Sequence, residues 1–275
     1  MKREYNNYKL EVNMQNFNYH THTYRCKHAV GDEINYIETA LKNGFKHLGF
    51  SEHCAYEDWE CSPGRIQVGE MDEYFDSINR AKEMYKDKIE IYRGLEIEYF
   101  PDLKNYFLEL KEKYDYLIVG EHSLDKNGRD VDIVCSDEDA KLYCKYICES
   151  IENKVADYVA HIDYFMLGRY DFNDICKSVV KEIASCAKAY DLPVELNLKG
   201  AAYGIKEYDG YKSYIYPHSK TIEILAEVNP TIVIGYDAHN PKVLEKRELE
   251  NDIRKWAKSY GLREPLEEYI IKKRK

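Results

Sequence analysis

The segment Asn18-Tyr-His-Thr-His-Thr-Tyr-Arg-Cys-Lys-His28 carries three histidines within eleven residues. In an extended strand successive side chains alternate between the two faces, so His20 and His22 point the same way and can bind one cation. His28 follows six residues later, where a strand would have become a loop. A single His-x-His pair is a weak signal, because most strand histidines are ordinary half-buried residues. Whether these residues bind metal depends on what the rest of the chain places beside them.

Strand-like and helix-like patterns alternate along the rest of the chain. Short apolar runs predict strands at 18–22, 47–51, 89–98, 116–119, 158–160, 193–196 and 231–234. Apolar residues at helical spacing predict helices at 32–42, 71–85, 101–112, 137–153, 173–189, 217–227 and 241–260. This alternation is typical of parallel strands joined by helices, which form either a barrel or a doubly wound sheet.

Length and charge favour one globular domain with a small-molecule partner. The chain has 275 residues, 44% of them hydrophobic, and it shows neither a linker-like stretch nor a fixed repeat, so we expect residues 1–275 to form a single domain. The net charge of −10 argues against nucleic acid and anionic membranes, which are held by clustered basic side chains. The basic tail at 272–275 is interpreted as a solvated terminus.

The sequence also predicts a cytoplasmic protein with free thiols. Residues 1–17 are polar, and no apolar run reaches the roughly 18 residues of a membrane span. The eight cysteines form no CxxC pair and are expected to stay reduced. We interpret Cys144 and Cys148 as packing residues of a helix, whereas Cys26 and Cys54 each neighbour a candidate ligand. The 27 tyrosines are scattered and indicate no single site.

Every predicted strand has a potential ligand or hydrogen-bonding group at its carboxyl end or just beyond it. In a (β/α) barrel the loops at that end converge on one cavity, where the active site lies. Seven of the nine histidines take part, and the other two, His47 and His218, are interpreted as a packing or surface residue and a helix cap. The residues at these positions are His20, His22, His28, His53, Glu96, His122, His161, Glu195, Asn197, Asp237 and His239.

The types of side chain in this set indicate transition metals. Seven imidazoles and two carboxylates suit Zn, Mn or Fe better than Ca or Mg, which prefer oxygen ligands. At about three or four protein ligands per ion, nine ligands imply two or three ions that share a bridging carboxylate. Such clusters suit phosphoryl transfer, because the ions neutralise phosphate oxygens, activate water and stabilise the leaving alkoxide.

These residues, in this order, resemble the PHP family, named for polymerase and histidinol phosphatase. The resemblance runs from about residue 18 to residue 246 and is strongest to the stand-alone histidinol-phosphate phosphatase type, with Tyr216-Pro217 before the last pair of helices. The matching motifs are His20-Thr-His22 with His28, Ser51-Glu52-His53, Gly94-Leu95-Glu96, Gly120-Glu121-His122, His161-Ile162-Asp163, Glu195-Leu196-Asn197 and Asp237-Ala238-His239.

The resemblance implies a distorted (β/α)7 barrel with three metal ions at the carboxyl ends of the strands. The implied ligands are His20, His22, Glu96 and Asp237 for one ion, Glu96, His122 and His161 for a second, and His28, His53 and His239 for a third. Glu96 would then bridge two ions. It also implies hydrolysis of L-histidinol phosphate in histidine biosynthesis, with Asp237, His239 and Glu96 as catalytic residues.

The residues that would bind the substrate's phosphate depart from the family pattern. A basic residue expected soon after the Glu-x-Asn motif is missing, and the chain reads Lys199-Gly-Ala-Ala202. Arg169 is our first choice for the missing charge, because a guanidinium can hold two phosphate oxygens at once. Lys199 is the second choice and Lys206 a third, although each of the three could equally be a solvated surface cation.

Other side chains have more than one interpretation. Asn197 either lines the cavity or satisfies buried backbone groups. The loop at 54–69, with Trp59 and Arg65, either covers the cavity and contacts substrate or is a surface excursion. Asp163 either orients His161, which is the role we expect, or caps the following turn.

We therefore expect a metal-dependent phosphomonoesterase that acts on L-histidinol phosphate as a monomer or small homo-oligomer. One alternative is a related phosphoesterase whose substrate is a nucleotide, a sugar phosphate or phosphotyrosine. An alternative of another class is a non-catalytic regulatory domain that binds metal. The complete ligand set argues against the latter, because loss of catalysis would relax the need for all nine residues.

Overall fold

The computed structural model describes residues 14–57, 59 and 64–271. Within them, seven parallel strands form one sheet in the order β1-β2-β3-β4-β5-β6-β9. Their bounds are β1 (Phe17–Asn18), β2 (His47–His53), β3 (Glu90–Ile97), β4 (Tyr116–Val119), β5 (Tyr158–Val159), β6 (Val194–Asn197) and β9 (Ile232–Gly235). A parallel bridge between Thr21 and Ala238 joins the two edges of the sheet, so it forms a nearly closed barrel. The predicted (β/α)7 barrel is confirmed.

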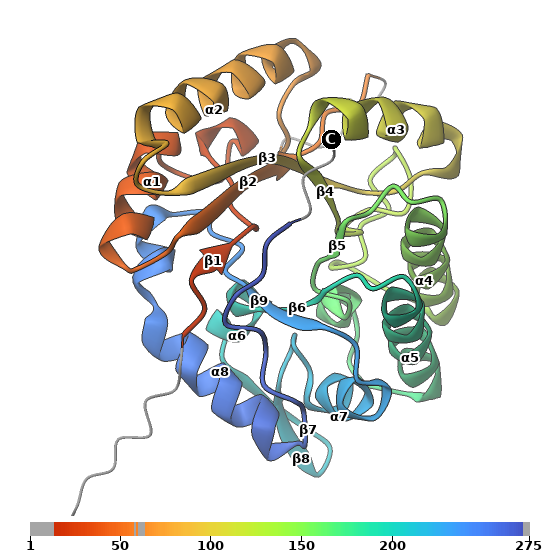
Figure 1. The fold of residues 1–275 in the computed structure, drawn as a ribbon. Coiled ribbons are helices and arrows are strands. Elements are labelled where there is room, and N and C mark those ends of the chain that lie inside the picture. The colour runs from red at the N-terminus through yellow and green to blue at the C-terminus, as the bar shows by residue number, and fades with distance from the viewer. Residues whose placement is uncertain (1–13, 58, 60–63, 272–275) are drawn as a thin grey trace, which may run out of the picture.

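Helices surround the barrel (Figure 1). They are α1 (Glu33–Lys42), α2 (Met71–Tyr85), α3 (Lys104–Lys113), α4 (Asp137–Glu152), α5 (Asp174–Ala189), α6 (Leu198–Ala202), α7 (Ser219–Val228) and α8 (Arg247–Ser259). The shorter 3-10 helices are η1 (Tyr24–Cys26), η2 (Val68–Glu70), η3 (Pro101–Leu103), η4 (Tyr164–Gly168) and η5 (Pro241–Glu245). Capping side chains start several helices: Asp32 accepts a hydrogen bond from the Asn35 N–H at 3.0 Å, and Ser136 accepts one from the Asp139 N–H at 3.1 Å.

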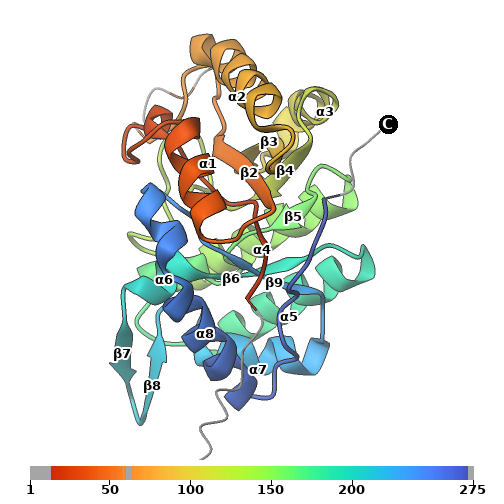
Figure 2. The same ribbon diagram turned by 60° about the vertical axis from the view of Figure 1, so that its left-hand side comes forward.

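The structure differs from the predicted elements in several places. The first strand ends at Asn18, and Thr21 then forms an isolated bridge with Ala238. The second strand runs on to His53, and the helix α6 was not predicted. The predicted helices that begin at Pro101 and Pro241 each start with a 3-10 turn. An antiparallel hairpin of β7 (Ile205–Tyr208) and β8 (Tyr211–Tyr214) was not predicted and projects beside α8 (Figure 2). Its sequence signal is Asp209-Gly210, a pair that favours two-residue hairpin turns.

Tyrosines fill the amino end of the barrel interior. Tyr19, Tyr92, Tyr116 and Tyr158 belong to one buried cluster, and the C-terminal segment with Tyr269 packs against it. Figure 1 shows this segment crossing the barrel. The hydroxyl groups have partners: Tyr116 donates to the Tyr19 carbonyl at 2.6 Å, and Tyr19 donates to the Tyr269 carbonyl at 2.7 Å. Because tyrosines fill the amino end, only the carboxyl end of the barrel interior has room for a binding site.

Alternate residues of β3 place a functional side chain above this tyrosine cluster. Tyr92, Gly94 and Glu96 share one face of the strand, so all three face the barrel interior. Gly94 leaves room for the Tyr116 ring: a Cβ at Gly94 would lie 2.3 Å from it. Glu96 is then the last interior residue of the strand and is only 1% exposed.

Replacing Gly94 by Ala should strongly destabilise the barrel. The Tyr116 ring is fully buried, so it has no space into which to move away from the added methyl group. We expect the free energy of unfolding to fall by about 3 kcal/mol, measured by urea denaturation. Gly69→Ala is the control, because nothing lies within 4 Å of a Cβ at that position. Equal stability of the two variants would show that the Tyr116 ring does not require a glycine.

Among the described residues, none of the helices combines the length and the apolar character that a membrane span requires.

Candidate metal centre

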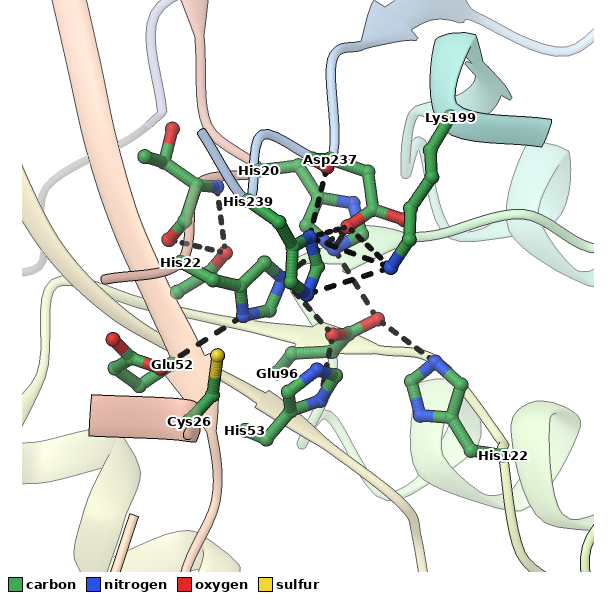
Figure 3. A network of polar contacts seen from close by, with 12 residues as sticks. His20, His22, Cys26, Glu52, His53, Glu96, His122, Lys199, Asp237 and His239 are labelled. Atoms are coloured by element: carbon green, nitrogen blue, oxygen red, sulfur yellow. Dashed lines mark hydrogen bonds and ion pairs between the residues drawn. The ribbon is translucent and has the colours of Figure 1, made fainter. Parts of the chain in front are cut away.

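The predicted ligands converge at the carboxyl end of the barrel, around the Glu96 carboxylate (Figure 3). They come from the ends of six strands or the loops just after them. One Glu96 oxygen lies 3.3 Å from His20 Nε2, 3.0 Å from His161 Nε2 and 3.6 Å from His122 Nε2. Its other oxygen lies 3.4 Å from His22 Nε2 and 3.1 Å from His53 Nδ1. Glu96 therefore lies within ligand spacing of five imidazoles from four different segments.

Asp237 is the second carboxylate of the cluster. Its Oδ1 lies 3.4 Å from His22 Nε2, 3.6 Å from His20 Nε2 and 3.2 Å from His239 Nδ1. The backbone of Asp237 has φ of 45°, in the left-handed region that residues other than glycine rarely adopt. Such backbone conformations are often found where the surrounding structure holds a functional side chain in place. Here that conformation accompanies a carboxylate directed at the histidines.

The donor atoms fit transition-metal ions. Buried atoms without a hydrogen-bond partner include His20 Nε2, both ring nitrogens of His22, Glu96 Oε2 and Asp237 Oδ1. Leaving so many buried polar atoms unpaired would be costly, and folded proteins usually satisfy them. Two ligands at about 2.0–2.1 Å from one tetrahedral ion stand roughly 3.4 Å apart, close to the spacing of these atoms. The cluster therefore has the composition and the spacing of a metal site.

Metal binding needs neutral imidazoles and ionised carboxylates, and only some of the predicted ligands have pKa shifts in that direction. Burial opposes protonation of His20 and His122, but the carboxylates around them, Glu195 for His20 and Glu96 for His122, raise the pKa of both rings. Burial lowers the pKa of His22 and of His53 well below the usual value. Burial alone would raise the pKa of Glu96, but the surrounding histidines, His20 first, hold it well below its usual range. Burial also opposes ionisation of Asp237, yet Lys199 and His20 keep the pKa of that carboxyl low.

Further carboxylates orient the ligand rings. Glu195 Oε2 lies 2.9 Å from His20 Nδ1 and accepts a hydrogen bond from the Tyr158 hydroxyl at 2.9 Å. Glu98 Oε1 lies 2.8 Å from His122 Nδ1. Partners of this kind fix ring orientation and tautomer in metal sites. Glu98 was not predicted from the sequence, although its position two residues after Glu96 placed it on the same strand face.

The outer part of the cluster is less regular than the predicted ligand groups. The predicted third group is brought together, because the His28 ring lies 4.6 Å from the His239 ring and 5.3 Å from the His53 ring. In this outer part, the residues whose possible ligand atoms lie within 4.8 Å of one another are grouped differently from the predicted ligand groups. They include His22 with His53 and His239, Cys26 with His28 and His239, and His53 with Glu98 and His122. The Cys26 thiol donates to the Thr23 carbonyl, and burial raises the pKa of this thiol to about 12.

Two of the predicted substrate-binding side chains lie beside the cluster. The Lys199 ammonium lies 3.3 Å from His239 Nδ1 and 3.6 Å from Asp237 Oδ1. The Arg65 guanidinium makes two hydrogen bonds of 2.5 Å to Glu98 and lies over the Trp59 ring, 4.2 Å from its centroid.

The other three basic or polar candidates have different partners. Arg169 donates to Asp137 at 2.6 Å and to the Cys135 carbonyl at 3.1 Å, so its guanidinium holds the loop before α4 rather than facing the cluster. Lys206 lies on the hairpin over the Tyr208 ring. The Asn197 side chain donates to Glu195 at 2.6 Å and to Asp237 at 3.2 Å, and its Oδ1 accepts a hydrogen bond from the Gly200 N–H at the start of α6. Asn197 therefore positions two carboxylates. The partners of Arg169 do not support the prediction that this side chain binds phosphate.

The structure also decides the roles of Asp163 and His218. The expectation that Asp163 orients His161 is wrong: its Oδ2 accepts a hydrogen bond from the His218 N–H at 2.7 Å, and His161 Nδ1 has no partner. Asp163 therefore fixes the start of α7. The predicted capping role of His218 is confirmed, since its Nδ1 accepts a hydrogen bond from the Lys220 N–H at 3.2 Å.

Two cavities open beside the predicted metal ligands. One, of about 340 Å³, is mostly apolar and reaches Asp237 and His239; we call it the apolar cavity. The other, of about 170 Å³, is polar and reaches His53 and His122; we call it the acidic cavity because Asp130 and Asp132 line it. Lys199 and His28 line both cavities. A molecule bound at the cluster could therefore extend in either direction.

Comparison with known proteins finds a family match over most of the chain. Residues 18–199 match the PHP domain. The "Probable histidinol-phosphatase" of Deinococcus radiodurans is 23% identical over 232 residues, which cover 81% of this chain and 85% of that protein. The histidinol-phosphatase of Bacillus subtilis is 30% identical over 161 residues, 54% of this chain and 59% of that protein.

A solved structure has the same fold. It is the histidinol phosphate phosphatase of Lactococcus lactis, crystallised with zinc, L-histidinol and phosphate. The TM-score is 0.66 and the sequence identity 18%, and the match covers 92% of this chain and 96% of that one. The likeness therefore extends to nearly the whole barrel.

Proposed function

Because this chain belongs to the PHP domain family, we propose that it is a metal-dependent phosphomonoesterase whose substrate is L-histidinol phosphate. The observation that carries the proposal is the cluster of buried, unpartnered donor atoms around Glu96 and Asp237. The substrate assignment is supported by the relatives described as histidinol-phosphatases. It is also supported by the Lactococcus lactis structure, which holds both products of that reaction.

We propose that the centre holds two to three divalent transition metal ions, Zn, Mn or Fe. Ions bound there would neutralise the phosphate oxygens and lower the pKa of water to generate a nucleophile near neutral pH. The residues that would hold them are His20, His22, His28, His53, Glu96, His122, His161, Asp237 and His239. Glu96 is the natural shared ligand, because its two oxygens face different histidines.

The chain's own side chains would bind the ester and move the proton. Hydrolysis forms a P–O bond to water, breaks the P–O bond to the alcohol and transfers one proton from water to the leaving alkoxide. Asp237 lies 3.2 Å from His239, and either group could accept this proton and return it to the alkoxide. Lys199 lies next to both and supplies positive charge where the phosphate would lie.

We also place the protein in the cytoplasm. The seven cysteines among the described residues are free thiols, as expected in a reducing compartment.

Phosphate release from a panel of esters tests the proposed function. We expect protein reconstituted separately with Zn, Mn and Fe to hydrolyse L-histidinol phosphate with kcat/KM at least about tenfold above that for a nucleotide, a sugar phosphate and phosphotyrosine, since two such esters differ by a few polar contacts. Chelator-treated protein is the control and should be inactive. Preference for another ester would overturn the substrate assignment. Metal binding without phosphate release from any ester would instead indicate a regulatory domain.

A further inference from the structure

The acidic cavity is built on the loop that follows β4, and this loop is tied to a metal ligand. The Val131 N–H donates to the His122 carbonyl at 2.9 Å, and the Leu124 N–H donates to the Arg129 carbonyl at 2.9 Å. Between these bonds Ser123 pairs with Asp130 through both backbone and side chain. The Asp130 carboxylate is therefore held at a fixed position relative to His122.

Tyr164 connects the other carboxylate of the cavity to the same ligands. Its ring lies 4.8 Å from the His122 ring and 4.9 Å from the His161 ring. Its hydroxyl donates to Asp132 Oδ2 at 3.3 Å. The Tyr164 side chain thus lies between Asp132 and the rings of His122 and His161. Asp132 lines the acidic cavity together with His122.

The charges in this cavity are not balanced by its own basic residues. Of the two that line it, Arg65 is paired with Glu98 and Lys199 faces Asp237. Within the described part of the chain, neither Asp130 nor Asp132 forms an ion pair. A cationic group in the cavity would therefore meet two carboxylates that have no cationic partner.

The apolar cavity offers the opposite environment. Its walls include Leu198, Val243 and Leu249, and Lys246 lines it together with Lys199. Lys199 is paired there with Asp237, which also lines this cavity, so a cation would meet the Lys246 ammonium and lose hydration against apolar walls. Charge therefore favours the acidic cavity for any positively charged part of a molecule bound at the cluster.

We propose that the acidic cavity binds the leaving alcohol of the substrate and selects esters whose alcohol carries an ammonium group, which Asp132 and Asp130 accept. The proposal rests on the proposed function and deepens it. In L-histidinol phosphate the ammonium is borne by the carbon next to the esterified one. When the phosphate lies at the metal ligands, this ammonium is necessarily close to them and can enter the cavity beside His122.

Asp132→Asn should reduce selectivity for the charged alcohol and leave phosphate chemistry intact. Asp132 is exposed, so the change should not disturb folding. We expect kcat/KM for L-histidinol phosphate to fall about 10- to 30-fold, the size of one charge-assisted contact, and kcat/KM for p-nitrophenyl phosphate, which has no ammonium, to change less than about twofold. The double variant Asp130→Asn/Asp132→Asn should lose more. Asp171→Asn, an exposed carboxylate that lines neither cavity, is the matched control.

Inhibition by the two reaction products measures binding to the site separately from the rate of hydrolysis. The inhibition constant of L-histidinol should rise by the same factor in Asp132→Asn, whereas that of inorganic phosphate should not change. Equal losses for both substrates, or wild-type values in the double variant, would overturn the proposal.

A second pair of substrates separates this proposal from the proposed function. If the wild-type protein does not cleave L-histidinol phosphate, the substrate assignment fails, and O-phosphoethanolamine is compared with glycerol phosphate. A preference for the ammonium ester that Asp132→Asn abolishes would support the cavity's role. Equal rates for the two esters would overturn it.

Discussion

Replacing Glu96 by Gln should lower kcat/KM by on the order of 1000-fold, the loss expected when several kcal/mol of metal-assisted stabilisation disappear. Glu96 lies within 3.6 Å of five imidazoles, and both of its oxygens take part. An amide carries no negative charge, and only one of its two polar atoms can bind metal. Glu96→Gln should therefore weaken the binding of two ions at once. Metal analysis after zinc reconstitution should find about one equivalent or less in the variant, against two to three in the wild type.

His28→Ala is the matched comparison for this effect. His28 is exposed at the edge of the cluster, and its Nδ1 already lies 2.8 Å from the Cys26 carbonyl. Its loss should therefore remove no more than one equivalent of metal. Equal metal losses in the two variants would contradict a bridging role for Glu96. One equivalent or less in the wild-type protein would contradict the proposed number of ions.

Local patterns predicted most of the barrel. The helix at 71–85 and the strand at 116–119 have the predicted bounds, because their apolar periodicity and their flanking turns agree. The first strand was overestimated, since beyond Asn18 the backbone bonds both to Ser51 of β2 and to Ala238, and only an isolated bridge forms with Ala238. The bonds to Ala238 depend on the far end of the sequence, which a local pattern does not contain.

The filling of the barrel interior was also not predictable from a local pattern. The tyrosines at 92 and 116 looked like two of many scattered aromatic residues. Their packing depends on Gly94 and Gly49, where a Cβ would lie within 2.3 Å of the Tyr116 side chain. Such complementarity joins neighbouring strands that are far apart in sequence.

The convergence of the predicted ligand side chains could be predicted for a physical reason that applies to the barrel as a whole. Parallel strands end on the same side, so histidines at successive strand ends must meet. The roles of the basic side chains could not be predicted in this way, because the partner of an arginine can lie far away in the sequence. Arg169, for example, donates to Asp137, 32 residues earlier. The path of the loop that carries Asp132 is likewise set by a hydrogen bond to His122 rather than by sequence periodicity.

Lys199→Ala should raise KM for L-histidinol phosphate by about 10- to 100-fold, the range for losing one charge-assisted hydrogen bond to phosphate. Lys199 is the basic side chain that both lines the two cavities and faces His239 and Asp237. Its side chain is 33% exposed, so its charge is available at the mouth. Metal content should not change, because an ammonium group has no lone pair for a metal.

Two further variants distinguish phosphate binding from a structural role of Lys199. Lys199→Arg should recover part of the lost affinity, since a guanidinium also donates to phosphate oxygens, whereas Lys199→Met keeps the apolar part of the side chain and should not. Arg169→Ala should leave KM unchanged, because its guanidinium is bonded to Asp137 and the Cys135 carbonyl. If Lys199→Ala stays within about twofold of the wild type in kcat/KM, the ligand cluster alone must neutralise the phosphate. A raised KM in Arg169→Ala would instead show that the loop it holds shapes the substrate site from a distance.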